Sequence, residues 1–440
     1  MPGPNSSSSY TTSIVIIGVL FFIFGFVTWI NGPLITFVKL AFDLDTDAKA
    51  FLVTTAFYMA YFFLALPASW VLERTGMKKG MALGLAVMAV GSILFGYFAT
   101  HRNYPLALTG LFIIGSGLSL LQTASNPYIS ILGPIESAAR RISIMGICNK
   151  GAGILSPIVL GLFVLQGLDQ LEARVAAAGE GPLREAILNE FAAKVWVPYL
   201  SMAGVLLLLA VWIVKSPLPE LKAADANPQP IGVDGSATRT SILQFPHLLL
   251  GALCIFVYVG VEVLAGDAIG TYGRSLGIPA DEAKYFTALT LACMLVGYVV
   301  GIATIPRYLS QERALAGSAV LGVVFAFGAF LTKGYASVYF VAALGLANAL
   351  MWPAIFPLAI RNLGRFTEKG SALLIMGIAG GAILPNLFAY FKDQYDFQAV
   401  FLAITVPCYL YVLFYARRGY RAGQSAAAAK GGSVLGAGSA

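Results

Sequence analysis

Apolar residues form long runs along the whole chain, and short polar stretches separate these runs. Each run is close to the length of about 20 residues that an α-helix needs to cross a hydrocarbon core of about 30 Å. The fold class expected is therefore an all-α membrane protein. The pattern predicts twelve transmembrane helices, at residues 12–38, 50–72, 80–99, 105–132, 142–166, 194–215, 245–272, 282–305, 313–332, 336–361, 370–392 and 397–416.

A polar segment rich in Pro, Gly and Ala lies between the sixth and seventh runs, and its composition is typical of a linker. We therefore expect an N-terminal six-helix half at 1–216, a cytoplasmic linker at 217–243 and a C-terminal six-helix half at 244–421. The remaining tail, 422–440, is low in complexity, and we expect it to be disordered.

The two halves resemble each other in sequence. The stretch "IMGICNKGAGILSP" begins at Ile144, and the similar stretch "IMGIAGGAILP" begins at Ile375. The pairs Asn126-Pro127 and Phe356-Pro357 are separated by almost the same interval, and each lies near the end of the preceding run. A parallel repeat of two six-helix halves around a midplane site is the plan of many alternating-access carriers.

Basic residues cluster in alternate loops, which indicates how the chain is oriented. They follow the second, fourth, eighth, tenth and twelfth runs, so the positive-inside rule places these loops and both termini in the cytoplasm. The opposite loops are short, except for "LDQLEARVAAAGEGPLREAILNEFAAK" after the fifth run. Its apolar spacing predicts a short amphipathic helix lying on the outer surface.

Composition and charge agree with a membrane protein. Hydrophobic residues make up 58% of the chain and charged residues 11%. The net charge of +7 comes from the orienting loops, so the lipid bilayer, and no nucleic acid, is the expected macromolecular partner. The four cysteines lie in apolar runs at unrelated spacings and predict neither disulfides nor a metal site.

Three ionisable side chains lie well inside apolar runs, namely Lys150 in the fifth run and Glu262 and Asp267 in the seventh. Intramembrane charges are costly, so each one marks a candidate functional residue. Lys150 lies about 12 Å into its helix at about 1.5 Å per residue. We expect its ammonium group to face the bundle interior; snorkelling to the membrane surface is the alternative.

Glu262 and Asp267 are five residues apart, about 140° around a helix, so they do not face one common partner. Glu262 lies deeper and is the expected partner of Lys150, either as a proton-exchanging group or as half of a purely structural ion pair. Asp267 lies nearer the outer end, where it either joins this ion-coupling set or is exposed to water.

Amide and aromatic side chains inside the runs suggest a sugar-sized binding site. Amides hydrogen-bond hydroxyl groups, and a few polar groups in an aromatic cavity are the general form of a ligand pocket. Asparagine in a membrane helix also often makes an interhelical hydrogen bond, so we expect about half of these side chains to line the cavity. The candidates are Trp29, Asn31, Gln122, Asn126, Asn149, Asn348, Trp352 and Asn386.

The sequence carries no pattern expected of an enzyme. The only histidines, His101 and His247, lie at the ends of runs, which argues against a histidine-based catalytic or metal site in the membrane. The phosphate-binding loop Gly-x-x-x-x-Gly-Lys-Ser/Thr does not occur. We therefore expect neither enzymatic activity nor a cofactor, with a proton or sodium ion as the only candidate coupling species.

Several stretches resemble the major facilitator superfamily and, within it, the fucose-galactose-glucose:proton symporter family. "LERTGMKKG" (72–80) is similar to a degenerate form of the superfamily's loop after the second helix. "LFIIGSGLSLLQTASNPYISILGP" (111–134), "AFYMAYF" (56–62) and "FPLAIRNLGRFTEKGSALLIMGIAGGAILP" (356–385) resemble that symporter family itself. The resemblance implies the twelve-helix major facilitator fold and a sugar substrate.

The chain also departs from that family at its charged positions. The family's first-helix acid aligns with Gly32 and its fourth-helix acid with Gln122, so both coupling carboxylates are missing. Lys150 stands where the family has a small residue, and Glu262 replaces an amide. The charged set is relocated, and coupling through the family's own residues is not expected.

We therefore expect a secondary active transporter for a hexose or related neutral sugar, working by alternating access. Proton symport with Glu262 and Lys150 as coupling residues is the leading hypothesis. A sodium-coupled or uncoupled sugar carrier, a sugar sensor on a carrier scaffold and a drug exporter are the alternatives. The expected location is the bacterial inner membrane, and the expected state is a monomer.

Overall fold

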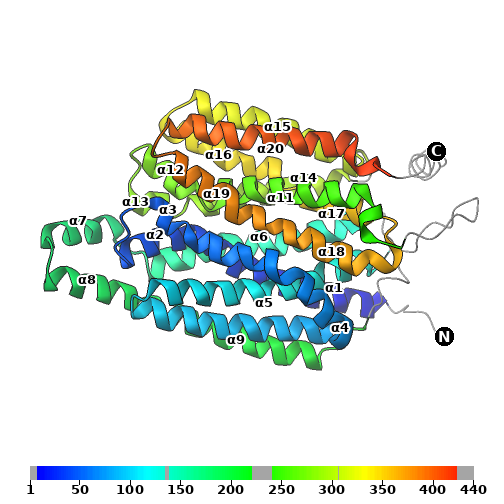
Figure 1. The fold of residues 1–440 in the computed structure, drawn as a ribbon, viewed down its shortest axis with the longest axis horizontal. Helices are drawn as coiled ribbons and strands as arrows, with labels where there is room; N and C mark the ends of the chain where they lie inside the picture. The colour runs from blue at the N-terminus through cyan, green and yellow to red at the C-terminus, as the bar shows by residue number, and fades with distance from the viewer. Residues whose placement is uncertain (1–6, 134–137, 221–239, 306, 424–440) are drawn as a thin grey trace, which may run out of the picture.

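The computed structural model describes residues 7–133, 138–220, 240–305 and 307–423, and these residues form helices and loops without any strand. The expected tail at 422–440 lies almost wholly outside the described residues, as does most of the expected linker. The helices run roughly parallel to one another in a single bundle (Figure 1). Their length and apolar composition are those of an integral membrane protein, as predicted.

The first half supplies six crossings. They are α1 (Ser7–Trp29) continued by α2 (Asn31–Ala41), the two legs of α4 (Leu52–Thr100), α5 (Tyr104–Ile131), α6 (Ala138–Phe163) and α9 (Trp196–Lys215). The second half supplies six more. They are α11 (Pro246–Gly266) followed by α12 (Ile269–Ser275), α14 (Phe286–Thr304), α15 (Gln311–Leu331), α16 (Gly334–Asn348) with α17 (Met351–Ile360), α18 (Thr367–Met376) with α19 (Gly380–Phe391), and α20 (Phe397–Arg417).

Short helical segments connect, flank or interrupt these crossings. They are α3 (Asp47–Ala50), α7 (Leu168–Ala178), α8 (Pro182–Ala193), α13 (Ala280–Ala283) and the 3₁₀ turns η2 (Ile242–Gln244), η3 (Gly364–Phe366), η4 (Gly377–Ala379) and η5 (Gly419–Arg421).

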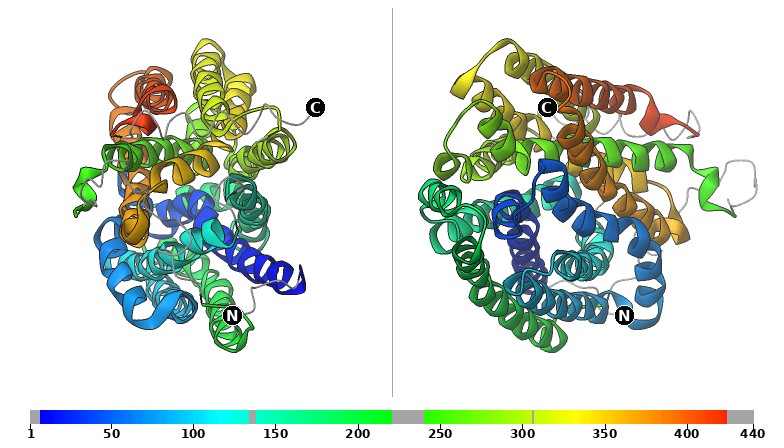
Figure 2. Two further views of the ribbon diagram at one scale, coloured as in Figure 1. Left: turned by 90° about the vertical axis from the view of Figure 1, so that its right-hand side faces the viewer. Right: turned by 60° about the vertical axis from the view of Figure 1, so that its left-hand side comes forward.

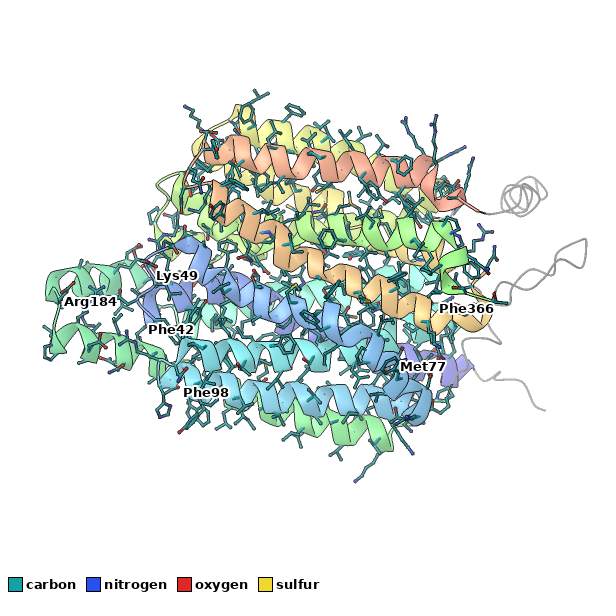
Figure 3. All side chains as sticks on the ribbon, in the orientation of Figure 1. Phe42, Lys49, Met77, Phe98, Arg184 and Phe366 are labelled. Carbon is teal, nitrogen blue, oxygen red and sulfur yellow. The ribbon has the colours of Figure 1, made fainter. Side chains whose placement is uncertain are left out.

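Helix α4 crosses the bundle twice. At about 1.5 Å per residue its 49 residues would be more than twice as long as a hydrocarbon core. Gly76 interrupts it with φ 77°, a conformation that glycine adopts without strain. Figure 3 shows Lys49 and Phe98 at one end of the bundle and Met77 at the other. The eleven long apolar helical segments of the described residues thus give the twelve predicted crossings.

The segment between α6 and α9 differs from the single surface helix that its sequence predicts. It forms two helices, α7 and α8, which turn back on each other at Gly179 and Gly181, both with positive φ. Val175, Ile187 and Leu188 bury their side chains between them. This α7–α8 hairpin projects from one end of the bundle, opposite the start of α1 and the end of α20 (Figure 1). We call the end with the hairpin the outer end and the opposite end the inner end.

The two halves pack face to face. Seen along the bundle, the first half and the second half form separate groups of helices (Figure 2). α6 contacts α14, and the first leg of α4 contacts α18 and α19, along their shared face. Glycines permit close approach there: a Cβ on Gly146 of α6 would lie 2.5 Å from the ring of Tyr298 on α14.

At the outer end, reciprocal hydrogen bonds close the halves against each other. The carboxylate of Asp169 in the first half accepts bonds from the backbone N–H groups of Ala280 (3.1 Å) and Asp281 (3.3 Å). The carboxylate of Asp281 accepts bonds from the N–H groups of Leu168 (3.2 Å) and Asp169 (3.2 Å). Lys284 adds a bond to the carbonyl of Leu165 at 2.8 Å. The outer end is therefore shut in this conformation.

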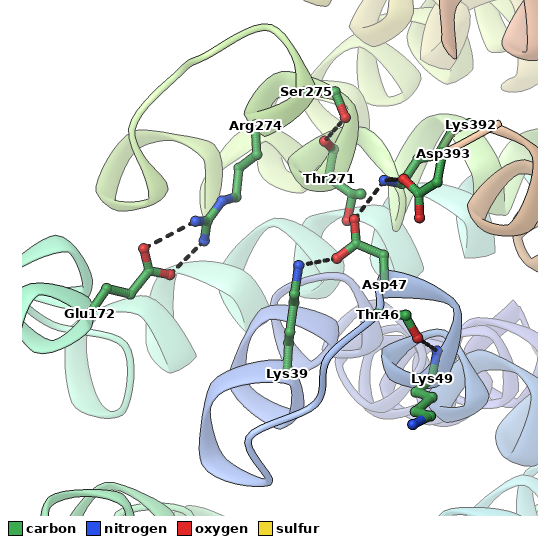
Figure 4. A network of polar contacts seen from close by, with 10 residues as sticks. All are labelled: Lys39, Thr46, Asp47, Lys49, Glu172, Thr271, Arg274, Ser275, Lys392 and Asp393. Atoms are coloured by element: carbon green, nitrogen blue, oxygen red, sulfur yellow. Dashed lines mark hydrogen bonds and ion pairs between the residues drawn. The ribbon is translucent and has the colours of Figure 1, made fainter. Parts of the chain in front are cut away.

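Two ion pairs between the halves reinforce this closure: Arg274 with Glu172 at 2.8 Å and Lys392 with Asp47 at 2.7 Å (Figure 4). The hydrogen bonds to Glu172 raise the pKa of Arg274. Burial opposes the charge of Lys392, but its bonds to Asp393 and Asp47 outweigh burial and raise its pKa. A cation with a raised pKa stabilises the folded protein until the pH rises through that pKa. Arg274 and Lys392 therefore both keep their charge near neutral pH.

The inner end is joined by fewer charges. Of the ion pairs formed by described residues, one links the halves there, between Lys369 and Glu73 at 3.7 Å, and both side chains are about half exposed. An exposed pair at this distance contributes little to stability. In this conformation, most of the ion pairs that join the halves at the two ends of the bundle therefore lie at the outer end.

Candidate functional site

A cavity of about 90 Å³ lies between the halves, near the middle of the bundle. Its walls come from crossings of both halves, so any movement of one half against the other changes its shape. Rings dominate the lining, and amides and one ion pair supply the polar groups. The lining residues are Phe21, Phe24, Thr28, Trp29, Tyr58, Tyr61, Gln122, Asn126, Ile142, Gly146, Asn149, Lys150, Tyr258, Val259, Glu262, Val263, Tyr298, Trp352 and Ile378.

Several helices are interrupted around this cavity. α1 ends at Trp29 and α2 resumes at Asn31, α16 gives way to α17 after Asn348, and η4 separates α18 from α19. Pro33 explains the first interruption, because proline has no N–H to donate to the preceding turn. Discontinuous membrane helices free backbone groups and often border substrate sites in transporters.

Lys150 and Glu262 meet across the two halves inside this cavity. The Nζ of Lys150 lies 3.0 Å from the Oε1 of Glu262, and the two side chains are 7% and 9% exposed. Lys150 therefore faces the interior, and the alternative that it snorkels to the surface does not hold. The pair joins α6 to α11, so separation of the halves at this point must break it.

Trp29 holds Lys150 in place. The ammonium lies 4.0 Å from the centroid of a Trp29 ring, which is within cation–π range. The indole N–H of Trp29 donates to Oδ1 of Asn149 at 3.2 Å, and the ring is buried. Trp29 was a candidate for packing against a sugar. In this conformation the Lys150 ammonium lies over its ring.

Two glycines make room for this indole. A Cβ on Gly153 of α6 would lie 2.6 Å from Cδ1 of Trp29, and a Cβ on Gly266 of α11 would lie 2.4 Å from its Cζ3. The indole is thus wedged between the halves next to the ion pair.

Substituting Gly153→Ala should lower the free energy of unfolding by about 1–3 kcal/mol, since the new methyl group must displace a rigid ring. Gly151→Ala, two residues away on the same helix, is the matched control, because a Cβ there meets nothing within 4 Å. Thermal unfolding of the purified proteins in detergent measures the difference. Equal stability of the two variants would show that the Trp29 wedge is not tightly packed.

Five of the eight predicted substrate-binding residues line the cavity: Trp29, Gln122, Asn126, Asn149 and Trp352. Gln122 donates from Nε2 to the hydroxyl of Tyr61 at 2.9 Å. Asn126 donates to the carbonyl of Gln122 at 3.0 Å, whereas its own Oδ1 is buried without a hydrogen-bond partner among the described residues. An unpaired acceptor in a cavity wall is suited to a ligand hydroxyl group.

The other three predicted residues do not line the cavity. Asn348 accepts a hydrogen bond from Tyr409 at 3.0 Å and links two helices of the second half. Asn386 donates to Oγ1 of Thr55 at 2.7 Å and belongs to the outer closure. Asn31 is fully buried outside the cavity lining. Asn348 and Asn386 thus link helices, which is the common alternative use of asparagine in a membrane. Both polar atoms of the Asn31 side chain are buried without a hydrogen-bond partner among the described residues.

Asp267 also lies outside the cavity lining, directly after the end of α11. It is 2% exposed, so the alternative that it is exposed to water does not hold in this conformation. Its Oδ2 accepts a hydrogen bond from the hydroxyl of Tyr58 at 3.3 Å. Gly32, the position that aligns with the family's first-helix acid, faces it: a Cβ there would lie 3.3 Å from Oδ1 of Asp267 and 2.4 Å from Oγ1 of Thr287.

The sequence reasoning missed most of the aromatic lining. Tyr58 and Tyr61 are one helical turn apart on α4 and stack with ring centroids 6.3 Å apart. Tyr258 lies one turn before Glu262 on the same face of α11. The spacing of these residues was a usable signal, because side chains three or four positions apart share a helix face.

Comparisons with known proteins agree with this architecture. The family model described as "Major Facilitator Superfamily" matches residues 17–384 of this chain. A glucose/galactose transporter of Brucella abortus is 32% identical over 414 residues, covering 93% of this chain and 95% of that protein. The L-fucose-proton symporter of Escherichia coli is 26% identical over 413 residues, covering 93% and 94%. A crystal structure of FucP in the outward conformation superposes with a TM-score of 0.75 at 26% identity, covering 93% and 99%.

Twelve crossings in two similar halves, with a midplane cavity between them, define an alternating-access carrier, and the chain belongs to the major facilitator superfamily. Within the superfamily it falls in the fucose-galactose-glucose:proton symporter family. The resemblance noted in the sequence is thereby confirmed.

Proposed function

We propose that this protein is a secondary active transporter, not an enzyme, that moves a hexose or related neutral sugar across the bacterial inner membrane by alternating access with proton symport. The observation that carries the proposal is the buried Lys150–Glu262 pair in an aromatic and amide-lined cavity between the halves. The relatives are named as sugar transporters, and two of them as proton symporters.

The cavity chemistry supports a neutral sugar. Amide groups of Gln122, Asn126 and Asn149 can bond hydroxyl groups, and the rings of Tyr61 and Trp352 supply flat apolar surfaces. Its only charged lining groups, among the described residues, neutralise each other in one ion pair. An anionic or cationic substrate would have to break that pair without compensation.

Orientation and assembly follow the same reasoning. The described chain ends lie together at the inner end (Figure 1), beside loops rich in Lys and Arg. We place this end in the cytoplasm and the α7–α8 hairpin on the opposite side. A monomer is the proposed state, because the described residues of one chain line the cavity from both halves.

Proteoliposomes holding the purified full-length protein test this function. With a panel of hexoses and related sugars, we expect saturable uptake of at least one sugar, driven by an inward proton gradient and indifferent to sodium. Uptake that requires sodium would replace the proton with that ion, and uptake that ignores both gradients would indicate a uniporter. Absence of uptake for every sugar would refute the sugar assignment.

A further inference from the structure

The centre of the bundle holds an unequal number of charges. Lys150, Glu262 and Asp267 are all buried. With all three ionised, one positive and two negative charges leave a net charge of −1. An uncompensated charge in a low-dielectric interior is strongly unfavourable. The cluster therefore favours the uptake of one cation.

The unbalanced carboxylate is Asp267. The ammonium of Lys150 is bonded to Glu262 at 3.0 Å and only acts on Asp267 through its charge. Oδ2 of Asp267 has one hydrogen bond, from Tyr58, at a long 3.3 Å. Oδ1 has no hydrogen-bond partner within the described part of the chain, although the backbone of Gly32 faces the carboxyl group.

The groups around Asp267 supply no second cation. From the first half, α4 contributes Tyr58, and α2 contributes the backbone at Gly32. From α14, Thr287 also faces Gly32, but its hydroxyl already donates to the carbonyl of Gly266 at 2.7 Å. Apart from Lys150 and Glu262, Tyr58 is the one titratable side chain that contacts Asp267 or acts on its charge within the described residues.

Asp267 also lies where a coupling group is useful. It is on the outer side of the cavity, at the contact between the halves, and Tyr58 touches both Asp267 and the cavity. Opening of the outer end must separate Asp267 from Tyr58, which belongs to the opposite half. Closure brings them together beside the cavity of about 90 Å³, which Tyr58 lines.

Building on the proposed symport function, we infer that Asp267 carries the transported proton on Oδ1 in this outer-closed state, while Glu262 stays ionised and paired with Lys150. The proton comes from water at the opened outer end and forms an O–H bond on the carboxylate, which becomes neutral. It leaves past Tyr58 to water in the cavity, and the carboxylate is restored. Because the cluster lacks one positive charge, we expect one proton to be transported in each cycle.

Isotope-edited infrared spectroscopy of the full-length protein distinguishes the two carboxyl groups. We expect the C=O band of the protonated carboxyl to shift when aspartate side chains are labelled with ¹³C and to stay in place when glutamate is labelled. In Asp267→Asn the band should be absent. A shift with labelled glutamate alone would overturn the inference.

Transport by Asp267→Asn gives a second measurement. We expect sugar counterflow to persist, which reports a folded carrier, and proton-driven accumulation to disappear. Asp267→Glu should restore part of the accumulation. Accumulation undiminished in Asp267→Asn would reject Asp267 and leave the sugar-transport function standing, whereas wild-type protein without any sugar flux would reject the function itself.

Tyr58→Phe tests the positioning role of the tyrosine. Loss of a donor to the carboxylate should move the pH of half-maximal proton-driven uptake upward by up to about one unit. Tyr199→Phe is the control, because Tyr199 lies on α9 outside the cavity lining and its buried hydroxyl has no hydrogen-bond partner among the described residues. A pH profile that moves equally in both variants, or in neither, would contradict the role of Tyr58.

Discussion

A Glu262→Gln protein should exchange sugar across the membrane and fail to concentrate it. With glutamine at this position, the charges of Lys150 and Asp267 balance each other, and the cluster no longer needs a proton. At one proton per sugar, a pH gradient of one unit stores about 1.4 kcal/mol, which sustains about tenfold accumulation. The expected result is a fall of that ratio to one.

In proteoliposomes, counterflow measures the sugar exchange that should persist, and proton-driven uptake measures the accumulation that should be lost. Glu190→Gln is the control, because Glu190 is an exposed carboxylate on the α7–α8 hairpin, distant from the cavity. It should keep the accumulation of the wild-type protein. If Glu262→Gln also accumulates sugar, Glu262 is not part of the coupling.

Removal of Lys150 should destabilise the fold more than any other single change at the site. Lys150→Met leaves the buried carboxylate of Glu262 without its cation, and breaking a buried ion pair from one side costs about 3–5 kcal/mol. The double variant Lys150→Met/Glu262→Gln should recover most of the stability, since it removes both members of the pair.

Thermal unfolding in detergent measures these effects. Lys333→Met, at an exposed position before α16, is the control and should change stability by less than about 0.5 kcal/mol. If Lys150→Met were as stable as Lys150→Met/Glu262→Gln, water would have to solvate the carboxylate of Glu262, and the Lys150–Glu262 pair would not be a buried ion pair in the membrane.

Most of the fold was predictable because the bilayer imposes one simple length rule on every crossing. The runs at 50–72 and 80–99 were predicted as separate crossings, and Gly76 lies between them. The outer hairpin was not predicted, because a single amphipathic period covers both of its helices. Its break was nevertheless visible in the sequence, since Gly179, Gly181 and Pro182 are residues that end and begin helices.

The candidate site was predictable only where a residue type is rare in membranes. Lys150 and Glu262 stand out in apolar runs, and the structure places them in contact. Amides do not stand out in this way: Asn149 lines the cavity, while Asn348 bonds Tyr409 within one half. Which use an amide has depends on the rotation and neighbours of its helix, and these are properties of the packed bundle.

The burial of Asp267 shows the same limit. Its distance along the seventh run suggested exposure at the outer end, but residues from the other half cover it in the outer-closed conformation. Solvent exposure near a membrane boundary depends on the conformational state of a carrier. A sequence position alone does not specify that state.

The most direct test of proton coupling is the sugar accumulation of the wild-type protein as a function of the imposed pH gradient, with the membrane potential held at zero. For the sugar that the panel identifies, a cluster that takes up one proton predicts about tenfold more accumulation for each pH unit. An accumulation ratio that stays at one across all gradients would contradict proton coupling through the central charges.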